Sequence, residues 1–135
     1  MTQQEADHDP QVITDMLLIC GNWARVITDP GATFSFVSSS FAPNLNAPPT
    51  LLGYDMLVQM SQGDLFCAQW EYKSCLVIME GEMLEANLVP FNLVKFDVIL
   101  GIDWLSRHRA YVACWEKSVT FNRPGRPLIT FQGER

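Results

Sequence analysis

Short apolar stretches separated by polar turn residues follow one another from residue 11 to residue 122. Their lengths are those of strands, and the long helical periods that βαβ crossovers need are missing from the pattern. The pattern therefore predicts an all-β fold, and the short strands favour closed or barrel-like packing. Asp103–His108 is the exception, because it predicts one or two helical turns with Asp103 as the N-cap.

Several of these stretches flank short turn segments and predict β-hairpins. The predicted hairpins are Val12–Cys20 with Trp23–Thr28 around Gly21-Asn22, Tyr54–Met60 with Leu65–Glu71 around residues 61–64, Cys75–Met79 with Met83–Val89 around Glu80-Gly81, and Ala110–Trp115 with Ser118–Phe121 around Glu116-Lys117. Phe96–Leu100 predicts a buried strand that ends at Gly101. Phe34–Phe41 fits a strand or a short helix because of its serines, and Asn44–Thr50 predicts a loop.

The length and apolar content of the chain predict a single domain. The 135 residues, 48% of them hydrophobic, suffice for one packed core and not for two. Residues 1–10 are polar and acidic, unlike a signal peptide, and are predicted to be an N-terminal extension. Pro124–Pro127 marks a boundary, so the domain is predicted over 11–122 and a linker toward a downstream domain over 123–135.

Charge and cysteine usage exclude several functional classes. The net charge of -6 repels phosphate backbones, so we expect no nucleic-acid binding by this domain alone. No apolar stretch is long enough to cross a membrane. The cysteines are widely spaced and only two histidines are present, which argues against a metal site or other cofactor. The four thiols (Cys20, Cys67, Cys75, Cys114) lie in apolar runs and are expected to be buried and reduced, as in a cytoplasmic protein.

One carboxylate stands out by its position. Asp29 follows an apolar strand and precedes Pro30-Gly31, and a glycine there allows a tight turn that exposes backbone to a cleft. Asp-Pro-Gly is also an ordinary turn sequence, so this motif by itself does not decide between structure and chemistry.

Two segments together resemble a known family. Ala24–Val37 (ARVITDPGATFSFV) resembles an apolar strand that runs into Asp-Thr/Ser-Gly-Ala-Thr, and Phe96–Leu105 (FDVILGIDWL) resembles the later apolar-apolar-Gly block. In this order they are similar to retropepsin-like aspartic proteases of gypsy-type LTR retrotransposon polyproteins. The resemblance covers about residues 11–122, and Val119–Phe121 with the following Pro/Gly segment is similar to the stretch that leads toward reverse transcriptase.

The resemblance implies a closed retropepsin-type barrel with one short helix near the C-terminus, and an aspartic endopeptidase. Its substrate would be its own polyprotein, and its setting the cytoplasm, including virus-like particles. Since the chain has one such Asp-x-Gly turn, a homodimer would supply the second Asp29. The implied site comprises catalytic Asp29; the active-site loop Pro30, Gly31, Ala32 and Thr33; the flap Met60, Ser61, Gln62, Gly63 and Asp64; and the loop support Ile99, Leu100 and Gly101.

One departure from the family pattern keeps other functions open. Pro30 replaces the family's Thr or Ser, whose hydroxyl bonds across the dimer axis, and proline has neither a hydroxyl nor a backbone N–H. A catalytically degenerate domain with a structural role is therefore an alternative, and an unrelated β-barrel binding module is another. Asp97 and Asp103 are competing carboxylates, whereas Ser38–Ser40 with His108 lack the GxSxG turn of a hydrolase triad.

Overall fold

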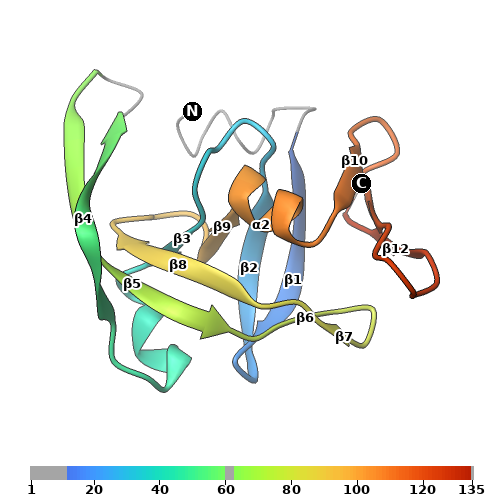
Figure 1. The fold of residues 1–135 in the computed structure, drawn as a ribbon, viewed down its shortest axis with the longest axis horizontal. Helices are drawn as coiled ribbons and strands as arrows, with labels where there is room; N and C mark the ends of the chain where they lie inside the picture. Colours follow the sequence, from blue (N-terminus) through green and yellow to red (C-terminus); the bar gives the residue numbers. More distant parts are fainter. Residues whose placement is uncertain (1–11, 60–62, 135) are drawn as a thin grey trace.

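The computed structural model describes residues 12–59 and 63–134 and consists mainly of strands (Figure 1). The strands are β1 (Ile13–Ile19), β2 (Asn22–Thr28), β3 (Phe36–Ser38), β4 (Thr50–Gln59), β5 (Leu65–Cys75), β6 (Val77–Met79), β7 (Glu82–Met83), β8 (Ala86–Phe91), β9 (Val98–Leu100), β10 (Ala110–Ala113), β11 (Ser118–Phe121) and β12 (Ile129–Gln132). The helical elements are the 3-10 turn η1 (Ala42–Leu45) and the helix α2 (Ile102–Arg107). The all-β prediction, with a short helix near the C-terminus, is confirmed.

The described strands form two sheets. One has the order β4-β5-β8-β3-β9-β2-β1-β6-β7, and the other has the order β10-β11-β12. Because β4 and β7 each pair on one side only, the hydrogen bonding of the described strands does not close the larger sheet into the expected barrel. Figure 1 shows the β4–β5 hairpin extending at one end of the molecule and the small sheet at the other.

The β1–β2 hairpin forms as predicted, but its turn lies one residue earlier than expected. Ile19 pairs with Asn22, so Cys20 and Gly21 occupy the turn, both with left-handed backbones (φ 49° and 83°). Such a two-residue turn matches the twist of the flanking strands. The Asn22 side chain closes it by donating to the carbonyl oxygens of Cys20 and Asn44 at 3.3 and 3.1 Å.

The middle of the large sheet is built from segments far apart in the sequence. β9 lies between β2, with which it is parallel, and β3, with which it is antiparallel. Val98 and Leu100 of β9 and Val37 of β3 are fully buried. A central strand with both faces covered must be apolar throughout, which explains the run that predicted it.

The ambiguous segment after the Asp29 turn divides into a strand and a turn of helix. β3 ends at Ser38, whose hydroxyl accepts a hydrogen bond from the Phe41 N–H at 3.0 Å. This local bond turns the chain into η1, which ends at the left-handed Asn46. The loop expected over Asn44–Thr50 is therefore helical at its start and extended at its end, where β4 begins.

The β4–β5 hairpin is longer than the predicted one. Its strands pair down to Gln59 and Leu65, with an irregular register between Leu51 and Met56. The third predicted hairpin turns at Glu80-Gly81 as expected, but it is very short. β8 then leaves it and pairs with β5 and β3, because its apolar residues are buried there.

The C-terminal region adds α2 and the small sheet. Trp104 anchors α2 in the core, is 2% exposed, and donates its indole N–H to the Leu84 carbonyl at 3.1 Å. The predicted hairpin at Glu116-Lys117 is confirmed by the pairing of β10 with β11. β12 then pairs with β11, so the segment 123–135, predicted as a linker, carries the last strand of the described chain.

Candidate active site

Asp29 lies at the end of β2 in a turn held by its own backbone and side chain. It is 5% exposed, and its N–H donates to the Leu100 carbonyl at 2.9 Å. Its Oδ1 accepts the Gly31 N–H at 2.8 Å, and its carbonyl accepts the Ala32 N–H at 3.1 Å. A Cβ at Gly31 would lie 3.1 Å from that Oδ1, so glycine leaves room for the carboxylate. The carboxylate is therefore fixed by the turn that follows it.

Pro30 sits inside this turn without disturbing its internal bonds. Gly31 and Ala32 provide the N–H groups that the Asp29 oxygens accept, and no N–H of residue 30 is needed. Proline also favours extended angles for the preceding residue, which suits the end of a strand. The half-buried Pro30 thus fits the fold of one chain, although it offers no donor to a second chain.

The end of β9 supports the Asp29 turn from beneath. Leu100 is fully buried and pairs with Thr28, the residue before Asp29. A Cβ on Gly101 would lie 2.4 Å from the Phe34 carbonyl oxygen and 2.7 Å from that of Ala32. The Ile102 N–H donates to the same Ala32 oxygen at 2.7 Å. Leu100 and Gly101, singled out in the sequence, therefore lie against the loop, and the half-buried Ile99 pairs with Ile27.

The inner face of the β4–β5 hairpin packs on the segment that follows the Asp29 turn. Met56 and Ala68 form a buried cluster with Val89, and partly buried apolar side chains cover it. These are Phe34, Phe36, Leu52, Val58 and Phe66. Of the residues expected to form a flap, Gly63 and Asp64 lie at the end of this hairpin, while Met60, Ser61 and Gln62 fall outside the described residues. The role of the flap therefore remains a prediction.

The other two candidate carboxylates have structural partners. Asp97 Oδ2 accepts the Arg25 N–H at 2.8 Å, which ties β9 to β2. Asp103 was expected to cap the helix, but the N-cap is Gly101 and α2 begins at Ile102. The Asp103 carboxylate instead accepts the Ser35 hydroxyl at 2.7 Å, a bond between residues far apart in the sequence that no local pattern signals.

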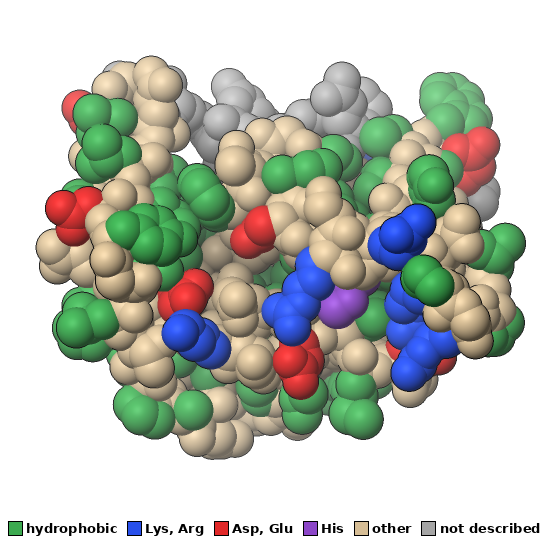
Figure 2. All heavy atoms as spheres, in the orientation of Figure 1, with side chains coloured by type: hydrophobic (Ala, Val, Ile, Leu, Met, Phe, Trp, Pro, Cys, Tyr) green, Lys and Arg blue, Asp and Glu red, His purple; other side chains and the backbone are tan. Residues whose placement is uncertain are grey.

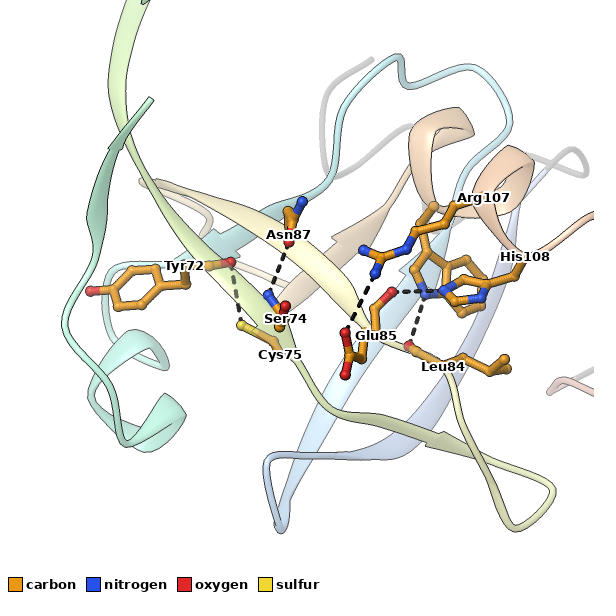
Figure 3. A network of polar contacts seen from close by, with 9 residues as sticks. Tyr72, Ser74, Cys75, Leu84, Glu85, Asn87, Arg107 and His108 are labelled. Carbon is orange, nitrogen blue, oxygen red and sulfur yellow. Dashed lines mark hydrogen bonds and ion pairs between the residues drawn. The ribbon is translucent and has the colours of Figure 1, made fainter. Parts of the chain in front are cut away.

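His108 and Ser38 do not meet as a catalytic pair. The His108 Nε2 lies 2.7 Å from the Glu85 carbonyl oxygen, next to the Arg107–Glu85 ion pair (Figure 3). Burial lowers the pKa of His108. The charges of Arg107 and Arg123 lower this pKa further, whereas the hydrogen bond with the Glu85 carbonyl opposes the shift. The Ser38 hydroxyl, at the end of β3, instead accepts the Phe41 N–H.

The cysteines carry free thiols, but only one of the four is buried as expected. All four are free; Cys75 is buried, Cys20 and Cys114 are half-buried, and Cys67 is exposed on β5. Burial, together with the neighbouring Cys20, raises the pKa of Cys75 to about 12, so its thiol stays protonated. Its Sγ lies 3.5 Å from the Tyr72 carbonyl oxygen (Figure 3). Among the described residues, no group of three or more His, Cys, Asp or Glu could hold a metal ion.

The surface gathers cations that are dispersed in the sequence. Figure 2 shows Lys and Arg side chains beside the histidine, with acidic side chains among them. Arg107 pairs with Glu85 at 3.4 Å, and Arg123 and Arg126 pair with Glu82 at 3.3 and 3.5 Å. Each of these three cations is therefore paired with a carboxylate. None of the helices in the described part of the chain has the length and hydropathy to span a membrane.

Comparisons with known proteins identify a matching family and similar folds. The family model described as retroviral aspartyl protease matches residues 1–126. The fold is similar to the crystal structure of the retroviral protease-like domain of Ddi1 from Leishmania major, with a TM-score of 0.64, 14% identity, and coverage of 93% of this chain and 95% of that one. It is also similar to EIAV protease in complex with the inhibitor HBY-793, with a TM-score of 0.57, 16% identity, and coverage of 74% and 90%. No curated protein matches the chain.

Proposed function

The chain belongs to the retroviral aspartyl protease family, and on that premise we propose that it is an aspartic endopeptidase whose active site forms between two copies of Asp29. One chain supplies one such carboxylate, and peptide hydrolysis by this route needs two. A symmetric homodimer would bring both Asp29 turns to its two-fold axis.

The proposed chemistry follows from two carboxyl groups in contact. They share one proton, because both cannot ionise at such short range. The ionised Asp29 takes a proton from water as the water oxygen attacks the scissile carbonyl carbon, and the protonated Asp29 of the other chain gives its proton to the carbonyl oxygen. Transfer of a proton to the amide nitrogen then breaks the C–N bond and releases an amine and a carboxylic acid.

The geometry of the Asp29 turn carries this proposal. The carboxylate accepts the Gly31 N–H at 2.8 Å and lies next to a strand whose last residue, Leu100, is fully buried, which restrains its orientation. Such preorganisation is what a reacting group requires, since a misplacement of about 1 Å can reduce the rate about 100-fold. The competing carboxylates Asp97 and Asp103 bind the Arg25 N–H and the Ser35 hydroxyl of their own chain.

The substrate and setting are part of the proposal. The long β4–β5 hairpin is a suitable flap, which would close over a bound polypeptide and exclude water. The substrate would be a gypsy-type retrotransposon polyprotein that contains this domain between its N-terminal extension and a downstream domain. The proposal requires no cofactor, nucleic acid or membrane, and it places the protein in the cytoplasm or in virus-like particles.

Pro30 favours a second candidate function. Without a hydroxyl or an N–H at this position, the two turns cannot exchange the hydrogen bonds that the family uses across its axis. A domain that keeps the fold but has lost catalysis, and acts as a structural or interaction module, would tolerate this substitution without consequence.

The test is cleavage of the parent polyprotein by the purified chain at mildly acid pH, beside Asp29→Asn. Asparagine keeps the shape but cannot exchange the proton, so we expect cleavage to slow by on the order of 100- to 10,000-fold. Asp15→Asn on β1 is the matched control and should cleave at the parent rate. Equal rates for parent and Asp29→Asn would reject the assignment, and a folded, dimeric parent that does not cleave would support the degenerate domain.

A further inference from the structure

The hydroxyl of Ser35 joins the segment that follows Asp29 to the start of α2. Its Oγ donates to Asp103 Oδ1 at 2.7 Å and accepts the Gly101 N–H at 2.9 Å. Ser35 is 1% exposed, whereas Asp103 lies at the surface. The hydroxyl therefore connects the backbone N–H of Gly101, which is buried, to the carboxylate of Asp103, which lies at the surface.

The two bonds reinforce each other. A serine hydroxyl has one proton, which is directed to the carboxylate, so its lone pair is free to accept from Gly101. A hydrogen bond to a charged acceptor is stronger than a neutral one, and it polarises the hydroxyl for the second bond. Asp103 also binds the N–H of Trp104 at 2.8 Å, which fixes its side-chain angle relative to the helix.

Backbone contacts on either side make this a continuous seam. The Ile102 N–H donates to the Ala32 carbonyl at 2.7 Å, and the Asp103 N–H donates to the Thr33 carbonyl at 3.3 Å. The side-chain bond from Ser35 to Asp103 closes the seam at its far end. Three successive contacts thus connect the chain that leaves the Asp29 turn to the first turn of α2.

We propose that Ser35 and Asp103 are positioning residues that hold the Asp29 turn in the position, relative to β9 and α2, that peptide hydrolysis needs. This inference rests on the proposed protease function. The Ser35 hydroxyl binds the Gly101 N–H and the Asp103 carboxylate, and we infer that the pair acts on the turn through Gly101 and through the carbonyls of Ala32 and Thr33. Loss of the seam would let the turn move without altering the carboxylate itself. The effect should therefore fall on kcat, with little change in KM.

The test compares Ser35→Ala, Asp103→Ala and Asp103→Asn at chain concentrations well above the dimer dissociation constant. Both alanine variants should lose kcat by on the order of 10- to 100-fold, with KM within about threefold of the parent. Asparagine offers an oxygen to the Ser35 hydroxyl, so Asp103→Asn should retain most of the parent kcat. The matched controls are Ser39→Ala, an exposed serine of the same segment, and Asp15→Ala on β1.

Amide hydrogen exchange gives a readout that does not depend on activity. In both alanine variants, exchange at Gly31 and Ala32 should accelerate by about tenfold or more, while exchange at Val119 in the small sheet should not change. If Ser35→Ala does not fold, Asp103→Ala carries the test, because its side chain is exposed.

The outcomes separate this inference from the proposed function. Cleavage that does not depend on Asp29 would reject the protease proposal, whereas exchange would still report on the seam. Parent-like kcat in Asp103→Ala, with or without faster exchange, would overturn the positioning role. A loss in Asp103→Asn as large as in Asp103→Ala would also overturn it, because the oxygen acceptor would then be irrelevant.

Discussion

At the scale of single residues, close approach of backbone groups decides the geometry around Asp29. A Cβ at Gly101 would overlap the carbonyl oxygens of Phe34 and Ala32, both of which belong to the chain leaving the Asp29 turn. Its φ is -100°, which any residue can adopt, so space and not backbone freedom selects glycine here. The missing Cβ is what allows β9 and the loop to pack in direct contact.

Gly101→Ala should therefore be strongly destabilising. The added methyl group would overlap backbone atoms, which cannot rotate away, and we expect a loss of about 3 kcal/mol or more in the free energy of unfolding. Cleavage should fall with it, because the Asp29 turn must move. Denaturant titration measures the stability. Gly125→Ala, in an open turn with left-handed backbone, should cost only about 1 kcal/mol. Equal losses in the two variants would contradict the packing argument.

At the scale of elements, α2 is too short to be stable alone and depends on its contacts. Trp104 buries one side of the helix, and its ring packs edge-on against Phe121 at 5.7 Å and His108 at 5.4 Å. His108 follows the last residue of the helix, and its N–H donates to the Trp104 carbonyl at 3.2 Å. Its ring then reaches the Glu85 carbonyl, so the helix end is joined to the segment before β8 (Figure 3).

The His108 contact should make stability depend on pH. Burial lowers the pKa of this ring below its ordinary 6.5, so the unfolded chain binds a proton more readily than the folded one. The contribution of the neutral His108 ring to the free energy of unfolding is complete above pH 6.5 and decreases as pH falls below 6.5. We expect the drop in Tm between about pH 7 and pH 5 to be smaller in His108→Gln than in the parent. Unchanged curves would exclude His108 as the titrating group. The control is His8→Gln, in the predicted N-terminal extension.

At the scale of the whole molecule, a single chain carries half of the proposed site. The two sheets and α2 fix one Asp29, and the second must come from another copy of the chain. Activity should therefore depend on the square of the chain concentration below the dimer dissociation constant. Pro30 matters for the proposed dimer, because it fits the turn within one chain but would offer no hydrogen bond to the second chain.

Pro30→Thr should tighten the dimer. Restoring a reciprocal pair of buried hydrogen bonds should contribute on the order of 1 to 3 kcal/mol to association, which is roughly 5- to 150-fold in affinity. Sedimentation equilibrium on the parent and Pro30→Thr measures this directly, and cleavage at low concentration should rise in parallel. Proline stiffens the unfolded chain, so the variant could lose some stability as a monomer. Equal dimer constants would mean that other contacts, such as those of the edge strand β12, hold the interface.

The hairpins could be predicted because their signals are local. Apolar residues on either side of a turn dipeptide predicted β1–β2. The one-residue error arose because Cys20 adopts a left-handed backbone, which is not typical of cysteine. The extent of β4 and β5 was underestimated for another reason. Their outer residues are exposed and irregular in register, and only pairing with each other and with β8 extends them.

The sequence by itself determined the all-β class, the order of the hairpins, the single Asp-x-Gly turn and the apolar strand before Gly101. These depend on the periodicity of side chains and on turn chemistry, which act over a few residues. Only the tertiary structure decided that Asp103 binds Ser35 instead of capping α2, that Cys67 is exposed, and that β12 joins the small sheet. Such contacts join residues distant along the chain, and their partners are selected by packing once the core has formed.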